Sequence, residues 1–158
     1  MPSLVGSEMC IRDSENTAPV TMDEMVLFTK AVSNARENAL IVADLPNKSY
    51  ENEADAVTNS ERLIRAGADA VKLEGRLPDI IRAIIKAGIP VMGHLGLLPQ
   101  TAKKYTVQGK TEADAKVLLA DAKALQEAGV FSIVLEMVAA ETTKHITCLL
   151  YTSPSPRD

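Results

Sequence analysis

The chain has 158 residues, of which 46% are hydrophobic and 24% are charged, a composition typical of one globular unit with a buried core. Lysine and arginine number 17 against 21 acidic residues, so the formal net charge is −4, and no basic patch is offered to nucleic acid or to an anionic membrane. No apolar run reaches the roughly 20 residues that span a bilayer, and the first residues lack a signal-peptide pattern. The sequence therefore predicts a cytoplasmic protein with neither nucleic acid nor membrane as a partner.

The two ends of the chain are related to each other in an unusual way. Segments 4–14 and 148–158 can be encoded by reverse complements: the codons ATG TGT ATA AGA GAC encode 9–13, and the complementary strand contains TGT CTC TTA TAC ACA, which encodes 148–152. Such an inverted repeat resembles a translated transposon-end adapter from sequencing libraries. We predict that residues 1–14 and 148–158 are adapter-derived tails and that residues 15–147 carry the fold. Both cysteines lie in these tails, so we expect neither a disulfide nor a thiolate metal site.

Helical and strand patterns alternate between the predicted tails. Thr21 to Glu24 forms a capping box, and apolar residues then recur at helical spacing as far as Asn38. The continuous apolar run 40–46 ends at a proline and is typical of a strand that is buried on both faces. The same patterns predict further helices over about 51–65, 80–87 and 112–128, and further strands over about 70–74, 90–95 and 131–138.

A short repeat marks the end of three predicted helices. Arg65-Ala-Gly67, Lys86-Ala-Gly88 and Glu127-Ala-Gly129 each stand just before a strand, where glycine supplies the left-handed cap. Helices that alternate with strands through short connections indicate an α/β fold with parallel strands, either an open doubly wound sheet or part of a barrel. Four strands are too few to close an eight-stranded barrel, which typically needs about 250 residues.

Polar side chains stand where the four predicted strands end. Asp44 ends the first strand, Lys72 and Glu74 end the second, His94 ends the third and Glu136 the fourth. Each has a structural alternative when taken alone: a surface ion pair, a turn cap or a packed histidine. Because the carboxyl ends of parallel strands meet at one edge, where such folds carry their active sites, we expect these side chains to converge. Together they offer oxygen ligands for a metal, one cation and a spare carboxylate base.

Five motifs carry a resemblance to a known family. They are Ala43-Asp-Leu-Pro46, Val71-Lys-Leu-Glu-Gly75, Gly93-His-Leu-Gly-Leu-Leu-Pro-Gln100, Tyr105-Thr-Val-Gln-Gly109 and Val134-Leu-Glu136. Together these motifs resemble ketopantoate hydroxymethyltransferase, also called 3-methyl-2-oxobutanoate hydroxymethyltransferase, over nearly all of 19–147. The resemblance implies a partial (β/α)8 TIM barrel as the catalytic domain in 15–147. It also implies transfer of a hydroxymethyl group from 5,10-methylenetetrahydrofolate to 3-methyl-2-oxobutanoate, giving 2-dehydropantoate in pantothenate biosynthesis.

The resemblance assigns a role to each polar strand end. It implies that Asp44 and Glu74 hold Mg²⁺ or a similar divalent metal, and that Asp44, Lys72 and His94 contact the oxo acid. Glu136 would be the general base. The partners implied are the oxo acid and the folate, and the full-length protein would be a homo-oligomer. The family's Asp-Ser-Leu-Gly turn and its last two barrel strands have no counterpart here, so we expect the chain to be an inactive fragment.

Two other interpretations remain open at this point. One is a related barrel of the phosphoenolpyruvate-mutase or isocitrate-lyase kind, which would act on another 2-oxo acid. The other is a non-catalytic assembly module whose free sheet edges pair with another chain, so that the polar strand ends would be incidental.

Overall fold

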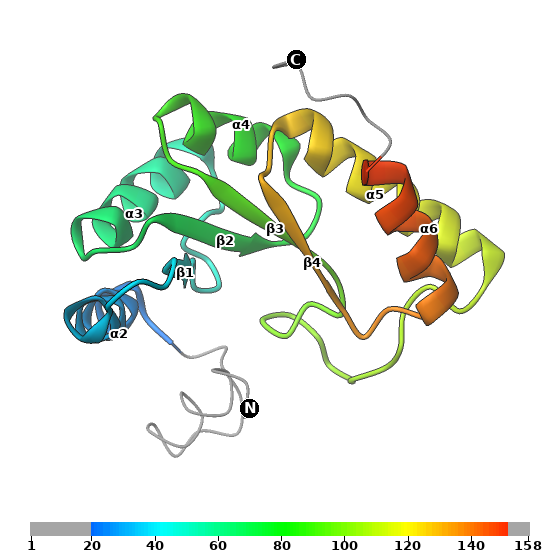
Figure 1. Ribbon diagram of the computed structural model, residues 1–158, viewed down its shortest axis with the longest axis horizontal. Coiled ribbons are helices and arrows are strands. Elements are labelled where there is room, and N and C mark those ends of the chain that lie inside the picture. The colour runs from blue at the N-terminus through cyan, green and yellow to red at the C-terminus, as the bar shows by residue number, and fades with distance from the viewer. Residues whose placement is uncertain (1–19, 152–158) are drawn as a thin grey trace.

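The computed structural model describes residues 20–151, and within this range helices alternate with strands along the chain (Figure 1). The predicted tail 1–14 and residues 152–158 lie outside the described range. The elements are α2 (Met22–Ala35), β1 (Val42–Asp44), α3 (Glu53–Arg65), β2 (Ala70–Glu74), α4 (Pro78–Lys86), β3 (Val91–Gly96), α5 (Glu112–Ala128), β4 (Ser132–Glu136) and α6 (Ala140–Tyr151).

The four strands form one parallel sheet in the order β1-β2-β3-β4, which confirms the predicted α/β class. The register pairs Asp44 with Lys72 across β1 and β2, and Glu74 with His94 across β2 and β3. Glu136 on β4 pairs with Gly96 on β3. The polar strand ends are therefore neighbours along one edge of the sheet.

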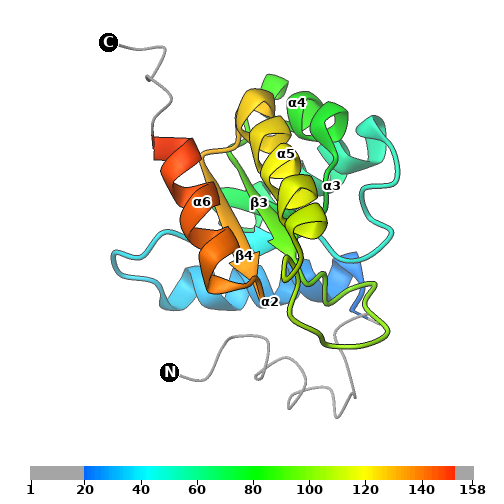
Figure 2. The same cartoon turned by 90° about the vertical axis from the view of Figure 1, so that its right-hand side faces the viewer.

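The helices pack against one another in chain order, α2 on α3, α3 on α4, α4 on α5 and α5 on α6 (Figures 1 and 2). Helix α4 shows how the sequence produces this layer. Pro78 opens its first turn, where a missing N–H costs nothing, and Ile81 and Ile84 are fully buried against the neighbouring elements. Gly129, at φ 98°, ends α5 in the left-handed conformation and turns the chain into β4.

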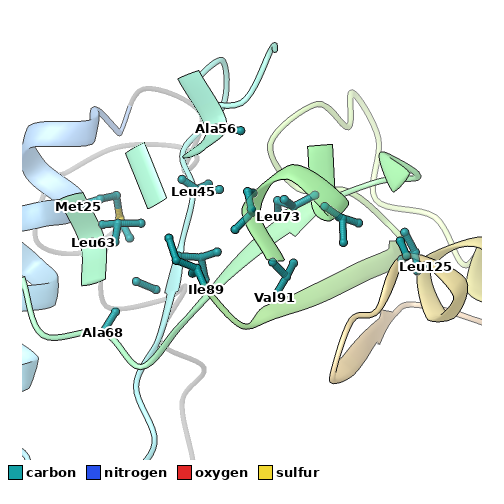
Figure 3. Packing of buried hydrophobic residues seen from close by; sticks show 14 of the residues in the cluster. Met25, Leu45, Ala56, Leu63, Ala68, Leu73, Ile89, Val91 and Leu125 are labelled. Atoms are coloured by element: carbon teal, nitrogen blue, oxygen red, sulfur yellow. The ribbon is translucent and has the colours of Figure 1, made fainter. Parts of the chain in front are cut away.

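The core lies between the helices and the sheet (Figure 3). Leu63 from α3, Leu125 from α5, Leu73 of β2 and Val91 of β3 belong to one buried hydrophobic cluster, and all four are essentially inaccessible to solvent. Full burial of one such side chain stabilises the fold by about 1.5–3 kcal/mol. Within the range described, no helix is both long enough and apolar enough to cross a membrane.

Several element bounds differ by a few residues from the sequence predictions, among them those of α3, α4, β3 and β4. The first helix ends at Ala35 rather than Asn38, and β1 is confined to 42–44 within the apolar run 40–46. Leu40 is 63% exposed because the chain joins the sheet only at Ile41, whose N–H donates to the Asp69 carboxylate. At the other end, the predicted tail boundary after residue 147 falls inside α6, whose continuation includes the partly buried Leu150. The adapter origin of the tails remains a prediction.

Candidate active site

One pocket of about 40 Å³ lies at the carboxyl edge of the sheet, and all five predicted site residues line it. They are Asp44, Lys72, Glu74, His94 and Glu136. The remaining lining comes from the N-terminal part of the described chain and from the loops after β1 and β3, namely Val20, Met25, Pro46, Pro99 and Gln100. A volume of this size holds a few water molecules or a small ion. The sheet register thus brings together residues that are scattered over the sequence.

Lys72 pairs with the carboxylate of the neighbouring strand. Its Nζ lies 2.9 Å from Asp44 Oδ2, and the Lys72 side chain is only 17% exposed. The surface pair between Lys72 and Glu74, which the sequence left open, is therefore replaced by a cross-strand pair inside the pocket. A largely desolvated ammonium is a strong electrostatic partner for an anion that enters beside it.

Glu74 is a buried acid among other polar groups. Its side chain is 8% exposed, and its Oε2 accepts a hydrogen bond from the Gln100 backbone N–H at 3.2 Å. Burial raises the pKa of Glu74 to about 7, and the Gln100 N–H and the Lys72 charge oppose this rise. A carboxyl group in this position exchanges its proton near neutral pH, or gives it up to a cation.

His94 lies between the Leu97 carbonyl and the Glu136 carboxylate. His94 is 2% exposed, and its Nε2 lies 2.9 Å from Leu97 O and 3.3 Å from Glu136 Oε2. Since both neighbours are acceptors, Nε2 carries the proton. Burial, reinforced by the Lys72 charge, lowers the pKa of His94, so a neutral imidazole bonded to Leu97 O lies beside the Glu136 carboxylate. Nδ1 of His94 is buried and makes no hydrogen bond within the range described.

The backbone around Glu136 is fixed from two sides. Leu97 N donates to Glu136 O at 2.9 Å, and a Cβ added at Gly96 would lie 2.2 Å from that same oxygen. Only glycine permits this approach, at a φ of 94°. Met137 directly follows Glu136 and has a φ of 47°, a backbone conformation that is uncommon for a residue other than glycine. The base candidate therefore projects from a constrained strand end.

One residue of the pocket lining, Gln100, makes contacts that the sequence did not reveal. Gln100 is the last residue of the motif Gly93–Gln100, but the sequence does not indicate which loop its side chain contacts. In the structure its Nε2 donates to Leu45 O at 2.8 Å, and its Oε1 accepts from Tyr50 Oη at 2.7 Å. These contacts join the loop after β3 to the loop after β1.

The acidic side chains offer a partial ligand set for a divalent cation. Asp44 and Glu74 line the same pocket, although the described chain contains no group of three or more histidines, cysteines or acids able to hold a metal. Mg²⁺ commonly takes one or two protein carboxylates and completes its shell with water and substrate oxygens. The two carboxylates fit a cation of that kind, with part of its shell supplied from elsewhere.

Comparison with solved structures identifies the fold of the chain. Over 95% of this chain and 53% of the other, the structure matches 2,3-dimethylmalate lyase, a member of the PEP mutase/isocitrate lyase superfamily, with a TM-score of 0.70 and 17% identity. Oxaloacetate acetylhydrolase in complex with 3,3-difluorooxalacetate matches with a TM-score of 0.71 and 14% identity, over 95% of this chain and 55% of that one. At these identities the likeness establishes the fold, an α/β architecture shared with that superfamily.

The family follows from closer relatives. The family model for ketopantoate hydroxymethyltransferase matches residues 4–152, and the chain belongs to this family. It is 56% identical to the 3-methyl-2-oxobutanoate hydroxymethyltransferase of Nitrosopumilus maritimus, over 91% of this chain and 54% of that protein. The enzyme of the same name from Moorella thermoacetica is 53% identical over 93% of this chain and 58% of its own length. The chain thus spans about half the length of the curated relatives it matches.

Proposed function

We propose that the protein to which this chain contributes transfers a hydroxymethyl group from 5,10-methylenetetrahydrofolate to 3-methyl-2-oxobutanoate and forms 2-dehydropantoate. The observation that carries the proposal is the shared pocket of Glu136, Lys72, Asp44 and Glu74 in a chain of this family. The pocket supplies a base, a cation and two acids at one place. Overall, a C–H bond at C3 of the oxo acid is replaced by a C–C bond to the folate methylene carbon. Water supplies the hydroxyl oxygen, and tetrahydrofolate leaves.

Glu136 is the base in this scheme. Its carboxylate takes the proton from C3, the carbon beside the ketone, and this leaves the electron pair that attacks the methylene carbon. The Nε2–H of the neutral His94 is directed to Leu97 O at 2.9 Å, and the same Nε2 lies 3.3 Å from Oε2 of Glu136, so the imidazole flanks the carboxylate while the basicity of Glu136 is preserved. The Leu97 and Gly96 contacts hold the backbone of the same residue. A base held in one position needs to lose less conformational freedom to reach the reactive geometry.

Lys72 and the two acids handle the negative charge. The largely desolvated ammonium of Lys72 binds an oxygen of the oxo acid and stabilises charge that develops when the proton leaves. Asp44 and Glu74 would hold Mg²⁺ through their oxygens, and the bound ion supplies electrophilic stabilisation of the substrate's carbonyl oxygen. Glu74 enters that role by losing its proton, which burial otherwise retains up to a pH of about 7.

The isolated chain should turn over poorly. In the described range β1 and β4 are the edge strands of the sheet, and unpaired strand edges favour association over a defined active site. Because the chain spans 54% of the Nitrosopumilus maritimus relative, the remaining segments can come from that protein. A chimera with residues 15–147 in place of the matching segment of that relative, called the chimera below, gives the site a complete surrounding.

The test follows the first chemical step alone. Exchange of the C3 proton of 3-methyl-2-oxobutanoate for deuterium is monitored by proton NMR in D₂O with Mg²⁺ and without folate. The chimera should catalyse this exchange, and adding 5,10-methylenetetrahydrofolate should then yield 2-dehydropantoate. A folded chimera that leaves this substrate untouched but exchanges the proton of oxaloacetate would support the phosphoenolpyruvate-mutase or isocitrate-lyase alternative. A folded chimera that exchanges neither would favour the assembly module.

A further inference from the structure

Gln100 connects two loops that are distant in sequence, and its hydrogen bonds reach Glu74 directly and the residue that follows Asp44. Its side-chain Nε2 donates to Leu45 O at 2.8 Å, directly after Asp44. Its backbone N–H donates to Glu74 Oε2 at 3.2 Å. Tyr50 Oη donates to Gln100 Oε1 at 2.7 Å. These three hydrogen bonds join Gln100 to Leu45, Glu74 and Tyr50.

The orientation of the Gln100 amide is determined by its partners. Leu45 O can only accept, so the NH₂ group faces it and Oε1 faces Tyr50. Burial raises the pKa of Tyr50 to about 12, with a further rise from the Glu74 charge, so the phenol keeps its proton and donates. An amide in this position satisfies both neighbours at once, whereas a carboxylate or a thioether in its place would lose the bond to Leu45 O.

The peptide that follows Asp44 is held on both sides. Leu45 is fully buried, and its N–H donates to Lys72 O at 2.8 Å, which continues the pairing of β1 with β2. Its carbonyl faces the other way and receives the Gln100 amide. The position of the Asp44 carboxylate therefore depends on β2 through one bond and on the loop after β3 through the other.

We propose that Gln100 is a positioning residue that sets the relative placement of the Asp44 and Glu74 carboxylates and thereby tunes the affinity of the pocket for a divalent cation. This inference rests on the proposed function, because it assigns the two acids to cation binding. Mg²⁺ demands near-ideal ligand geometry, so a small displacement of either carboxylate lowers affinity. Loss of a residue that supports metal ligands typically weakens binding about 10- to 100-fold.

Three variants of the chimera separate positioning from packing. Gln100→Met keeps the length of the side chain and removes its two hydrogen bonds. Tyr50→Phe removes the phenol hydroxyl alone, and the double variant removes this hydroxyl together with the Gln100 amide. Gln108→Met is the matched control, since Gln108 lies on the same loop and its amide bonds Thr106. Mn²⁺ binding is measured by electron paramagnetic resonance of the free ion, which needs no catalytic activity.

Gln100→Met should weaken Mn²⁺ binding about 10- to 100-fold, with unchanged binding in Gln108→Met. Tyr50→Phe should cost less, roughly 2- to 10-fold, because one neutral hydrogen bond is lost. The double variant should match Gln100→Met alone, since the phenol acts through the amide. In the exchange assay, Gln100→Met should raise the Mg²⁺ concentration needed for half-maximal rate while leaving the rate at saturating Mg²⁺ within about threefold.

Mn²⁺ affinity that is unchanged in Gln100→Met overturns the inference and leaves the proposed function standing if exchange persists. Conversely, a chimera that binds Mn²⁺ but exchanges no proton loses the proposed function, while the ranking of the variants still decides the role of Gln100. A chimera that binds no Mn²⁺ overturns the inference outright. Should Gln100→Met unfold, Tyr50→Phe decides, because that variant removes a single hydrogen bond: its Mn²⁺ affinity must fall, and an unchanged affinity overturns the inference.

Discussion

The two edges of the sheet are built from the same strands but serve different purposes. At the amino edge, helices α3, α4 and α5 pass into the next strand through glycines in the left-handed region, with φ values of 105° at Gly67, 84° at Gly88 and 98° at Gly129. At the carboxyl edge, the strands end in charged or polar side chains around a pocket of about 40 Å³. One edge is specified by backbone conformation, and the other by side-chain chemistry.

The difference shows where changes should affect folding and where they should affect chemistry. At the amino edge the chain is constrained sterically, so a misfit must be absorbed by the packed core. At the carboxyl edge, Glu74 and His94 are buried polar groups, which are costly for stability and are kept where they serve a function. Substitutions at the two edges should therefore affect stability and activity in opposite proportions.

Replacing the base should give the largest loss and leave the fold intact. Glu136→Gln in the chimera should slow C3 proton exchange about 100- to 10,000-fold, because an amide cannot accept the proton. Its melting temperature should stay close to that of the parent, since the amide has nearly the same shape as the carboxylate and His94 keeps its hydrogen bond to Leu97 O. Glu141→Gln, on the exposed face of α6, is the control and should exchange at the parent rate. Exchange that survives in Glu136→Gln would assign the base to another residue.

The sequence predicted the convergence of the carboxyl edge because strand ends and register are local properties. The bounds of β2 agree with the structure, and the capping box at Thr21 is present, with Glu24 N donating to its hydroxyl at 3.3 Å. In a parallel sheet, correct strand ends place Asp44 and Glu136 on the same edge without further information. The α/β class, predicted from alternating helical and strand patterns, is confirmed by the parallel sheet, and the family, predicted from short motifs in a fixed order, is confirmed by the family model.

What the sequence could not predict depends on loops. The contacts of Gln100 with Tyr50 and Leu45 join segments about 50 residues apart, and no periodicity encodes how two loops meet. The pairing of Lys72 with Asp44 rather than Glu74 needed side-chain positions across two strands. Leu40 looked like part of a buried strand because hydrophobicity alone does not say where a chain joins a sheet.

Adding one methyl group at the amino edge should destabilise the fold while sparing the site. A Cβ at Gly67 would lie 2.0 Å from Ser33 Oγ, whereas a Cβ at Gly88 meets nothing within 4 Å. Gly88→Ala should therefore cost about 1–2 kcal/mol of unfolding free energy from its positive φ alone. Gly67→Ala should cost about 2–4 kcal/mol, since overpacking adds to the same strain. Urea denaturation of the chimera measures both values, and equal costs would show that the contact with Ser33 relaxes freely.

Removing the Lys72 ammonium should weaken substrate binding. Lys72→Met in the chimera should weaken binding of 3-methyl-2-oxobutanoate roughly 10- to 100-fold, the size expected for a hydrogen bond to a charged group. Isothermal titration with the oxo acid in the presence of Mg²⁺ measures the change. Lys116→Met is the matched control, since Lys116 pairs with Glu112 on the exposed side of α5. Unchanged affinity in Lys72→Met would limit Lys72 to its pair with Asp44.

The smallest expected effect is on the free energy of unfolding at acid pH. It tests the carboxyl edge through stability rather than activity. His94 resists protonation in the folded state because of burial and the Lys72 charge, with Glu136 and Asp44 opposing, whereas the unfolded chain takes up the proton below the ordinary value of 6.5. Its contribution to stability is therefore present above pH 6.5 and is lost as the pH falls below that value. Metal-free His94→Gln should lose less unfolding free energy between pH 7.5 and 5.5 than the parent does.

The comparison with the parent matters because Glu74 acts in the opposite direction. Its pKa is raised to about 7 from an ordinary 4.5, so the folded state gains relative stability as the pH falls from 7 toward 4.5. A pH profile of the parent alone mixes the two contributions, but the difference between the parent and His94→Gln isolates the histidine. If that difference is independent of pH, the imidazole takes up its proton in the folded state as readily as in the unfolded chain. The assignment of a neutral imidazole, held by burial next to Glu136, would then be wrong.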